Sequence, residues 1–297
     1  MKHYFFSLNF PHTFIYTETG REQNSGLNMA AGRDICIFFF PFLTTIATLV
    51  LACLVFVGSY KDVAVVNDIY FLRLNLTNID LSSLGGTSQD SAVANDLASE
   101  FGISNIYDAG ANGYCKGTEN GTIVGCFSPT TPYWFDLVTI LETDANTGVT
   151  VTLPSNIQDY EKTLKAASEA MWICYIIGIG LTGIELFIGF FAFHSRTASC
   201  CSMLFAGIGC LFLFLASAIA TGIFIVYKDE FNKNLSSFGV TAALGSKAFI
   251  LTWVAAAASL VSAVWWMFSI CCGSTRYGRS HEEEKEPFIG YVPHHGY

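Results

Sequence analysis

The sequence predicts an all-α transmembrane four-helix bundle with a small α+β extracellular domain in the loop after the first helix. Only 13% of the 297 residues are charged and 52% are hydrophobic, whereas a soluble globular chain carries about 25% charged residues. Four stretches reach the length of about 20 mostly apolar residues that a membrane-spanning helix needs. These stretches are residues 35–58, 171–193, 203–227 and 249–272.

The loops between these stretches differ sharply in charge. Residues 59–170 contain fourteen acidic and five basic side chains, whereas the rest of the chain contains ten of each. The net charge of −9 therefore lies in one loop, which is long enough to form a small domain. No segment is basic enough to bind nucleic acid. The remaining segments are residues 1–34, 194–202, 228–248 and 273–297, and we expect residues 1–28 to be either a gene-model extension or a disordered tail.

The orientation in the membrane follows from sequons and cysteines rather than from basic residues, which flank both sides of the spans. An even number of spans places both termini on one side. Three Asn-x-Ser/Thr sequons, at Asn75, Asn120 and Asn234, all lie in the first or last loop. Cys115 and Cys126 are the only cysteines of the large loop, and outside the cytosol they should form a disulfide. We therefore expect cytosolic termini.

The other eight cysteines fall into two groups. Four lie in or at the edge of the spans, where we expect them to pack as small apolar side chains: Cys36, Cys53, Cys174 and Cys210. The other four form pairs at the cytosolic ends of helices, and they are candidates for S-palmitoylation, with idle thiols as the alternative. These pairs are Cys200-Cys201 and Cys271-Cys272.

The large loop carries patterns of both strands and helices. Residues 69–77 alternate as in a half-buried strand, with Asn75 on the solvent side, and residues 149–153 repeat this alternation. Apolar residues between Ala94 and Phe101 have helical spacing. Ser155 to Gln158 resembles a capping box, which predicts a helix running without a break into the second span.

The chain lacks the side chains that most enzymes and channels require. All six histidines lie outside the extracellular loops, which excludes a histidine-based triad or zinc site there. Scattered carboxylates without a further signature are typical of a solvated surface. Channel and transporter spans usually carry several ionisable groups, whereas here Glu185 alone lies deep in a span. We therefore expect neither an enzyme nor a transporter, and no cofactor or metal.

Gly178, Thr182, Glu185 and Gly189 follow one another at steps of four, three and four residues and therefore share one helix face. A carboxyl group facing lipid would cost a few kcal/mol, so we expect this face to point into the bundle. Counting equal depths along the neighbouring spans indicates Thr44 or Thr45 and Ser262 as partners. The hypothesis is an intramembrane polar clasp; a lipid or proton site and a tolerated accident are the alternatives.

Several motifs resemble the claudin-type superfamily and, more closely, the fungal Sur-seven/PalI family. The superfamily shares the four spans, the short last loop and the cysteine pair of the first loop. Animal claudins place a tryptophan just before their first cysteine, where this chain has Tyr114, and this difference argues against junctional adhesion. The closer resemblance rests on residues 97–107, 112–117, 133–136 and 171–180.

The resemblance implies a multi-pass protein of the fungal plasma membrane with a claudin-like extracellular sheet. One branch of the family organises eisosomes, which are furrow-like cortical membrane domains, and affects the cell wall. The PalI branch assists a receptor for ambient pH. The short tail after the last span favours the eisosome branch. Expected partners are the lipid bilayer, further copies of the chain, and cortical scaffold or membrane-receptor proteins.

Overall fold

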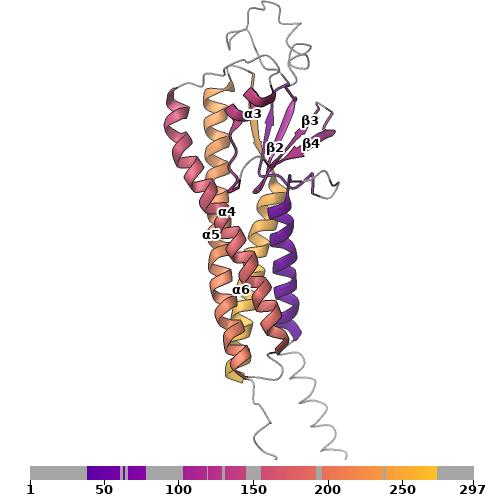
Figure 1. The fold of residues 1–297 in the computed structure, drawn as a ribbon, viewed down its shortest axis with the longest axis vertical. Helices are drawn as coiled ribbons and strands as arrows, with labels where there is room; N and C mark the ends of the chain where they lie inside the picture. Colours follow the sequence, from indigo (N-terminus) through magenta and orange to yellow (C-terminus); the bar gives the residue numbers. More distant parts are fainter. Residues whose placement is uncertain are drawn as a thin grey trace, which may run out of the picture.

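The structure is a computed structural model that describes residues 39–60, 63, 66–77, 103–118, 120–128, 131–144, 155–191, 196–236 and 239–272. Four helices are long and apolar enough to cross a membrane, and a five-stranded sheet lies at one end of them (Figure 1). The first spanning helix is Phe39–Val57. The other three are α4 (Ser155–Phe191), α5 (Arg196–Asn234) and α6 (Ser246–Cys272).

Both α4 and α5 extend far beyond the stretches that hydropathy alone indicates. Helix α4 begins at Ser155, as its capping box predicts, and continues unbroken into the second span. Helix α5 continues past residue 227 because Tyr227, Phe231 and Leu235 recur every four residues and bury one face against the sheet. The upper part of α5 therefore supports the sheet.

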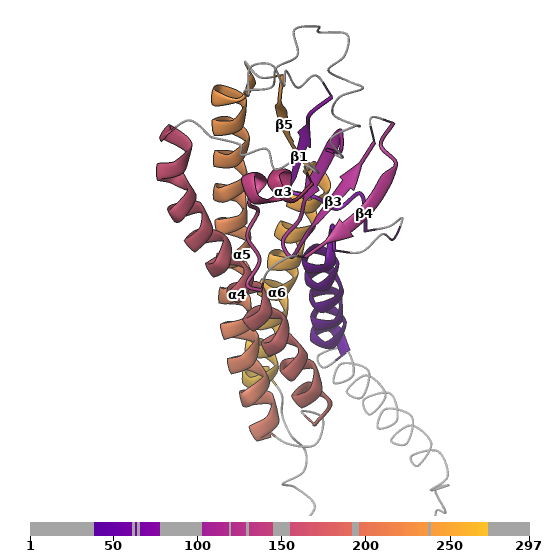
Figure 2. The same ribbon diagram turned by 45° about the horizontal axis from the view of Figure 1, so that its top comes forward.

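The sheet is antiparallel throughout, in the order β4-β3-β2-β1-β5. Four strands come from the large loop: β1 (Leu72–Asn75), β2 (Ile106–Ala109), β3 (Tyr114–Gly117) and β4 (Ile123–Phe127). The fifth strand, β5 (Thr241–Leu244), comes from the last loop and pairs with β1. The short helix α3 (Leu137–Asp144) lies beside the sheet (Figure 2). The last loop thus folds together with the first loop.

One hydrophobic core joins the sheet to the spanning helices. Leu72 and Leu74 of β1 are fully buried and belong to the same cluster as Phe224 and Tyr227 of α5. Phe71, just before β1, was expected on the solvent side of the strand, but it is 1% exposed. Its ring stacks on Phe224, with the centroids 4.8 Å apart, and meets Phe249 edge-on at 5.2 Å. The sheet is therefore anchored in the bundle.

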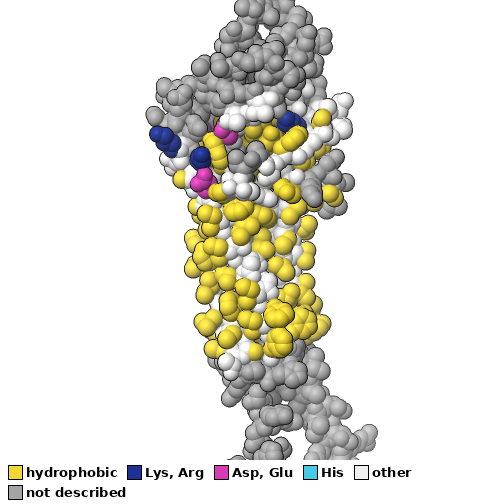
Figure 3. Space-filling model, in the orientation of Figure 1, with side chains coloured by type: hydrophobic (Ala, Val, Ile, Leu, Met, Phe, Trp, Pro, Cys, Tyr) yellow, Lys and Arg dark blue, Asp and Glu magenta, His cyan; other side chains and the backbone are white. Residues whose placement is uncertain are grey.

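The lipid-facing surface of the bundle is apolar, and charged side chains gather at the end that carries the sheet (Figure 3). Large hydrophobic side chains are exposed along all four spans, including Phe187 at 68%, Ile250 at 62% and Leu204 at 58%. This is the surface that a bilayer requires. Three expectations fall outside the described residues: the helix between Ala94 and Phe101, the strand at residues 149–153, and everything said of residues 1–34 and 273–297.

Candidate functional site: buried polar clusters and a joint between sheet and bundle

Glu185 of α4 lies inside the membrane bundle and is 3% exposed. Its Oε1 atom accepts three hydrogen bonds, from Thr45 Oγ1 at 2.7 Å, Ser262 Oγ at 2.9 Å and Trp266 Nε1 at 2.9 Å. The hydroxyl oxygens of Thr45 and Ser262 are themselves 2.7 Å apart. We call these four residues the Glu185 cluster. It connects the first spanning helix, α4 and α6.

The structure separates the two threonines that the sequence left open. Thr45 reaches Glu185, whereas the hydroxyl of Thr44 bonds to the carbonyl oxygens of Phe40 and Pro41 in its own helix. Neighbouring helical residues point about 100° apart, so equal depth does not determine which of them faces inward. Trp266 was missed altogether, because a tryptophan in a span is usually assigned to the membrane interface.

Close packing of α4 against α5 brings the Glu185 face into the interior. A Cβ atom on Gly178 would lie 2.8 Å from the side chain of Leu213, so only glycine fits at this crossing. Thr182, one turn further along, is 2% exposed and bonds to the carbonyl oxygen of Gly178 at 2.9 Å. Small residues at such crossings let membrane helices approach closely.

A second polar cluster lies nearer to the sheet. The Tyr175 hydroxyl is 2.5 Å from Thr252 Oγ1, which lies 2.8 Å from Ser217 Oγ. All three side chains are buried. This cluster connects α4, α5 and α6, so the two clusters together include all four spanning helices.

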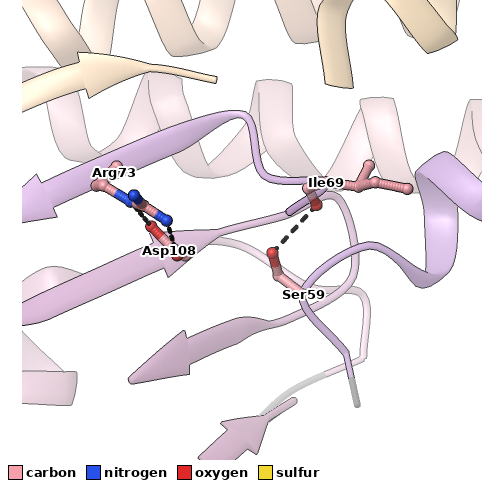
Figure 4. A network of polar contacts seen from close by, with 4 residues as sticks. All are labelled: Ser59, Ile69, Arg73 and Asp108. Atoms are coloured by element: carbon pink, nitrogen blue, oxygen red, sulfur yellow. Dashed lines mark hydrogen bonds and ion pairs between the residues drawn. The ribbon is translucent and has the colours of Figure 1, made fainter. Parts of the chain in front are cut away.

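The five-stranded sheet contains an ion pair and a disulfide. Asp108 of β2 is fully buried and accepts two hydrogen bonds from Arg73 of β1, at 2.6 and 2.7 Å (Figure 4). Burial raises the pKa of the Asp108 carboxyl above its ordinary value, and the bonds from Arg73 lower it in opposition. Cys115 and Cys126, directly opposite one another on β3 and β4, form the disulfide.

The turn between β2 and β3 packs against the sheet-side end of the first spanning helix. A Cβ atom on Gly110 would overlap the carbonyl oxygen of Gly58, and one on Gly113 would lie 2.7 Å from the carbonyl oxygen of Phe127. Asn112 Oδ1, in the same turn, accepts a hydrogen bond from Trp172 Nε1 of α4 at 2.7 Å.

Ser59 completes this joint from the side of the first helix. It has a positive φ of 59° and bonds to the carbonyl oxygen of Ile69 at 3.2 Å (Figure 4). Residues 112–117, which carry part of the family resemblance, thus include contacts between sheet and bundle.

The remaining candidate residues lie at the two ends of the molecule. Asn75 and Asn120 are exposed near the sheet, and Asn234 is half-buried at the end of α5. Cys200 is exposed and Cys201 half-buried at the opposite end of α5. Cys271 and Cys272 are the last two residues of α6, and their side chains lie outside the described part of the chain. Within the described residues, no three His, Cys, Asp or Glu side chains form a group that could hold a metal ion.

Four membrane-spanning helices with an antiparallel five-stranded sheet after the first of them fit a claudin-like fold. Within this class, the sequence matches the SUR7/PalI family over residues 37–265. The chain belongs to that family.

Two relatives are similar over much of their length. The SUR7 family protein pun1 of Schizosaccharomyces pombe is 28% identical over 219 residues, covering 69% of this chain and 75% of that protein. Protein PUN1 of Saccharomyces cerevisiae is 22% identical over 264 residues, covering 85% of this chain and 98% of that protein.

Proposed function

We propose that this protein is a non-enzymatic structural organiser of a fungal plasma-membrane domain, of the eisosome type, that affects membrane and cell-wall organisation. The observation that carries the proposal is the shared core and glycine-lined joint between sheet and bundle. Because of this joint, the extracellular sheet and the lipid-facing helices move as one body. Such a body can hold neighbouring lipids, further copies of the chain and a cortical scaffold in fixed relative positions.

The proposed orientation has the sheet outside and both termini in the cytosol. The Cys115–Cys126 disulfide supports it, because disulfides persist in oxidising compartments. The free cysteines Cys200 and Cys201 lie at the other end of the bundle, in keeping with a reducing cytosol. A tag at the C-terminus should resist protease on intact spheroplasts and be cleaved after permeabilisation; cleavage on intact spheroplasts would reverse the orientation.

We further propose that acyl chains on the cytosolic cysteine pairs strengthen retention in the domain. Cys200 is exposed and continues the line of lipid-facing side chains formed by Leu204 and Ile208, which are 58% and 47% exposed. A buried acyl chain contributes about 0.8 kcal/mol per CH₂. Acyl–biotin exchange should lose more label in Cys200→Ala than in Cys201→Ala, whereas the span residue control Cys210→Ala should keep it. Equal labelling of all three variants would contradict acylation at Cys200.

The organiser role is tested by imaging a fluorescent fusion of the full chain in living fungal cells. We expect cortical patches that recover slowly after photobleaching, beside a freely diffusing plasma-membrane protein as control. A diffuse rim signal that follows a pH-signalling receptor would instead support the alternative role of an accessory membrane protein of the PalI type.

A further inference from the structure

The three sequons have different structural surroundings, although the sequence alone treats them alike. Asn75 and Asn120 are exposed, whereas Asn234 is half-buried. An oligosaccharide attached to asparagine occupies solvent beside the side chain, so exposure is the first requirement.

Asn75 and Asn120 lie in backbone that suits an acceptor sequon. Asn75 ends β1, and its Oδ1 accepts a hydrogen bond from the Thr77 backbone N–H at 2.9 Å, which forms an Asx-turn. The Asx-turn brings residue i+2 of the sequon back toward the asparagine amide. Asn120 lies in the tight turn between β3 and β4, next to Gly121 with its φ of 78°. That turn is closed by bonds between Thr118 and Thr122 and between Gly121 and Thr118, each 2.9 Å long.

The side-chain amide of Asn234, in contrast, is held by hydrogen bonds within α5. It is the last residue of α5, and its Nδ2 atom donates to the backbone oxygen of Glu230 at 3.0 Å and to Glu230 Oε2 at 2.9 Å. The atom that would carry the glycan is therefore occupied.

We infer that the protein carries N-linked glycans at Asn75 and Asn120 and none at Asn234. In the reaction, Nδ2 of the asparagine forms a bond to the anomeric carbon of a lipid-linked oligosaccharide. The bond from that carbon to the lipid diphosphate breaks, the lipid diphosphate leaves, and the amide proton passes to a base of the transferase. The inference rests on the proposed extracellular position of the sheet.

Both glycans would project from the end of the sheet that is distant from the membrane. Strand β1 starts beside Phe71, which is seated on Phe224 and Phe249 of the spanning helices, and it ends at Asn75. Strand β3 starts beside the joint at Gly113, so the turn that holds Asn120 lies at the distal tip of the hairpin. The glycans would thus cover the outward-facing rim and leave the sides of the sheet free.

The test is the electrophoretic mobility of the full-length protein before and after treatment with an N-glycosidase. We expect a decrease in apparent mass that corresponds to two glycans. Asn75→Gln and Asn120→Gln should each abolish one step, their combination both steps, and Asn234→Gln none. Thr77→Ala and Thr122→Ala remove the same sequons while keeping each asparagine, and Thr77→Ser, which preserves the sequon, should stay glycosylated. A step lost in Asn234→Gln, or an unchanged mass of the wild type, would overturn the inference.

The outcome is separable from that of the organiser proposal. Cortical patches without a glycosidase shift would overturn the glycan inference alone. Two glycans on a freely diffusing protein would overturn the organiser role alone.

Discussion

Asp108 and Glu185 are the two acids among the described residues that are buried, with exposures of 0% and 3%. Asp108, in the sheet, faces a guanidinium group that forms two hydrogen bonds with it. Glu185, in the membrane, is met by two hydroxyls and an indole N–H. Arg73 keeps 33% of its side chain in solvent, and this hydration is not available to a cation at the depth of Glu185. The surrounding medium therefore determines which partner a buried carboxyl group receives.

The largest loss of stability is expected when the Arg73–Asp108 ion pair loses its cation. Arg73→Met leaves the Asp108 carboxylate buried without compensation and should lower the free energy of unfolding by about 3 kcal/mol, the lower end for buried pairs because Arg73 is partly exposed. Thermal unfolding in detergent measures this. Lys247→Met is the matched control, since the Lys247–Asp68 pair is mostly exposed and should contribute little. Equal effects of the two substitutions would contradict the importance of burial.

A pH series sharpens the same comparison. Without Arg73, burial acts unopposed, so the pKa of Asp108 in the folded state rises further above its unfolded value. The folded variant then binds a proton that the unfolded chain releases, and its stability increases as the pH falls toward the ordinary aspartate pKa of about 3.9. We expect the deficit of Arg73→Met relative to wild type to shrink at acid pH. A deficit that grows there would exclude Asp108 as its cause.

The next effect concerns Glu185 and the neutral donors around it. Glu185→Leu removes three interhelical hydrogen bonds, each worth about 0.6 kcal/mol in membrane proteins, so the bundle should lose about 2 kcal/mol of stability. Glu185→Gln keeps an acceptor oxygen in place and should remain close to wild type in detergent. If the glutamine variant folds normally but leaves its cortical patches, the charge itself is required and the purely structural role is wrong.

The smallest effect separates one donor from the rest of the cluster. Trp266→Phe removes the hydrogen bond to Glu185 but keeps an aromatic ring, and it should cost about 0.6 kcal/mol. Trp265→Phe is the control, because the Trp265 ring packs against Phe40 with centroids 4.3 Å apart. The two variants are compared by their unfolding temperatures in the same detergent. A larger loss of stability in Trp265→Phe would contradict a stabilising hydrogen bond between Trp266 and Glu185.

The sequence predicted what depends on composition and on spacing along one element. The spans, the capped start of α4 and the alternation of β1 follow from hydropathy and period. The inward orientation of Glu185 was also predictable, because Gly178 and Thr182 lie on the same face of the helix.

Contacts between residues that are far apart in the sequence could not be predicted. Asp108 looked like one more surface acid of an acidic loop, because its partner Arg73 is 35 positions away. Strand β5 has only four residues, Thr-Ala-Ala-Leu, and derives its strand structure from pairing with β1. The side chain of Asn232 donates a hydrogen bond of 2.9 Å to the backbone oxygen of Ala242 and accepts one of 2.8 Å from its N–H. These bonds pair the outer edge of β5, and no sequence pattern indicated them.

Helix α4 is unbroken, and its tight crossing with α5 near Gly178 divides it into two arms. At 1.5 Å per residue, the arm toward Ser155 is about 35 Å long and the arm toward Phe191 about 20 Å. Figure 2 shows α4 crossing α5, with its upper arm on one side of α5 and its lower arm on the other. The arm toward Ser155 is therefore about 1.8 times as long as the arm toward Phe191.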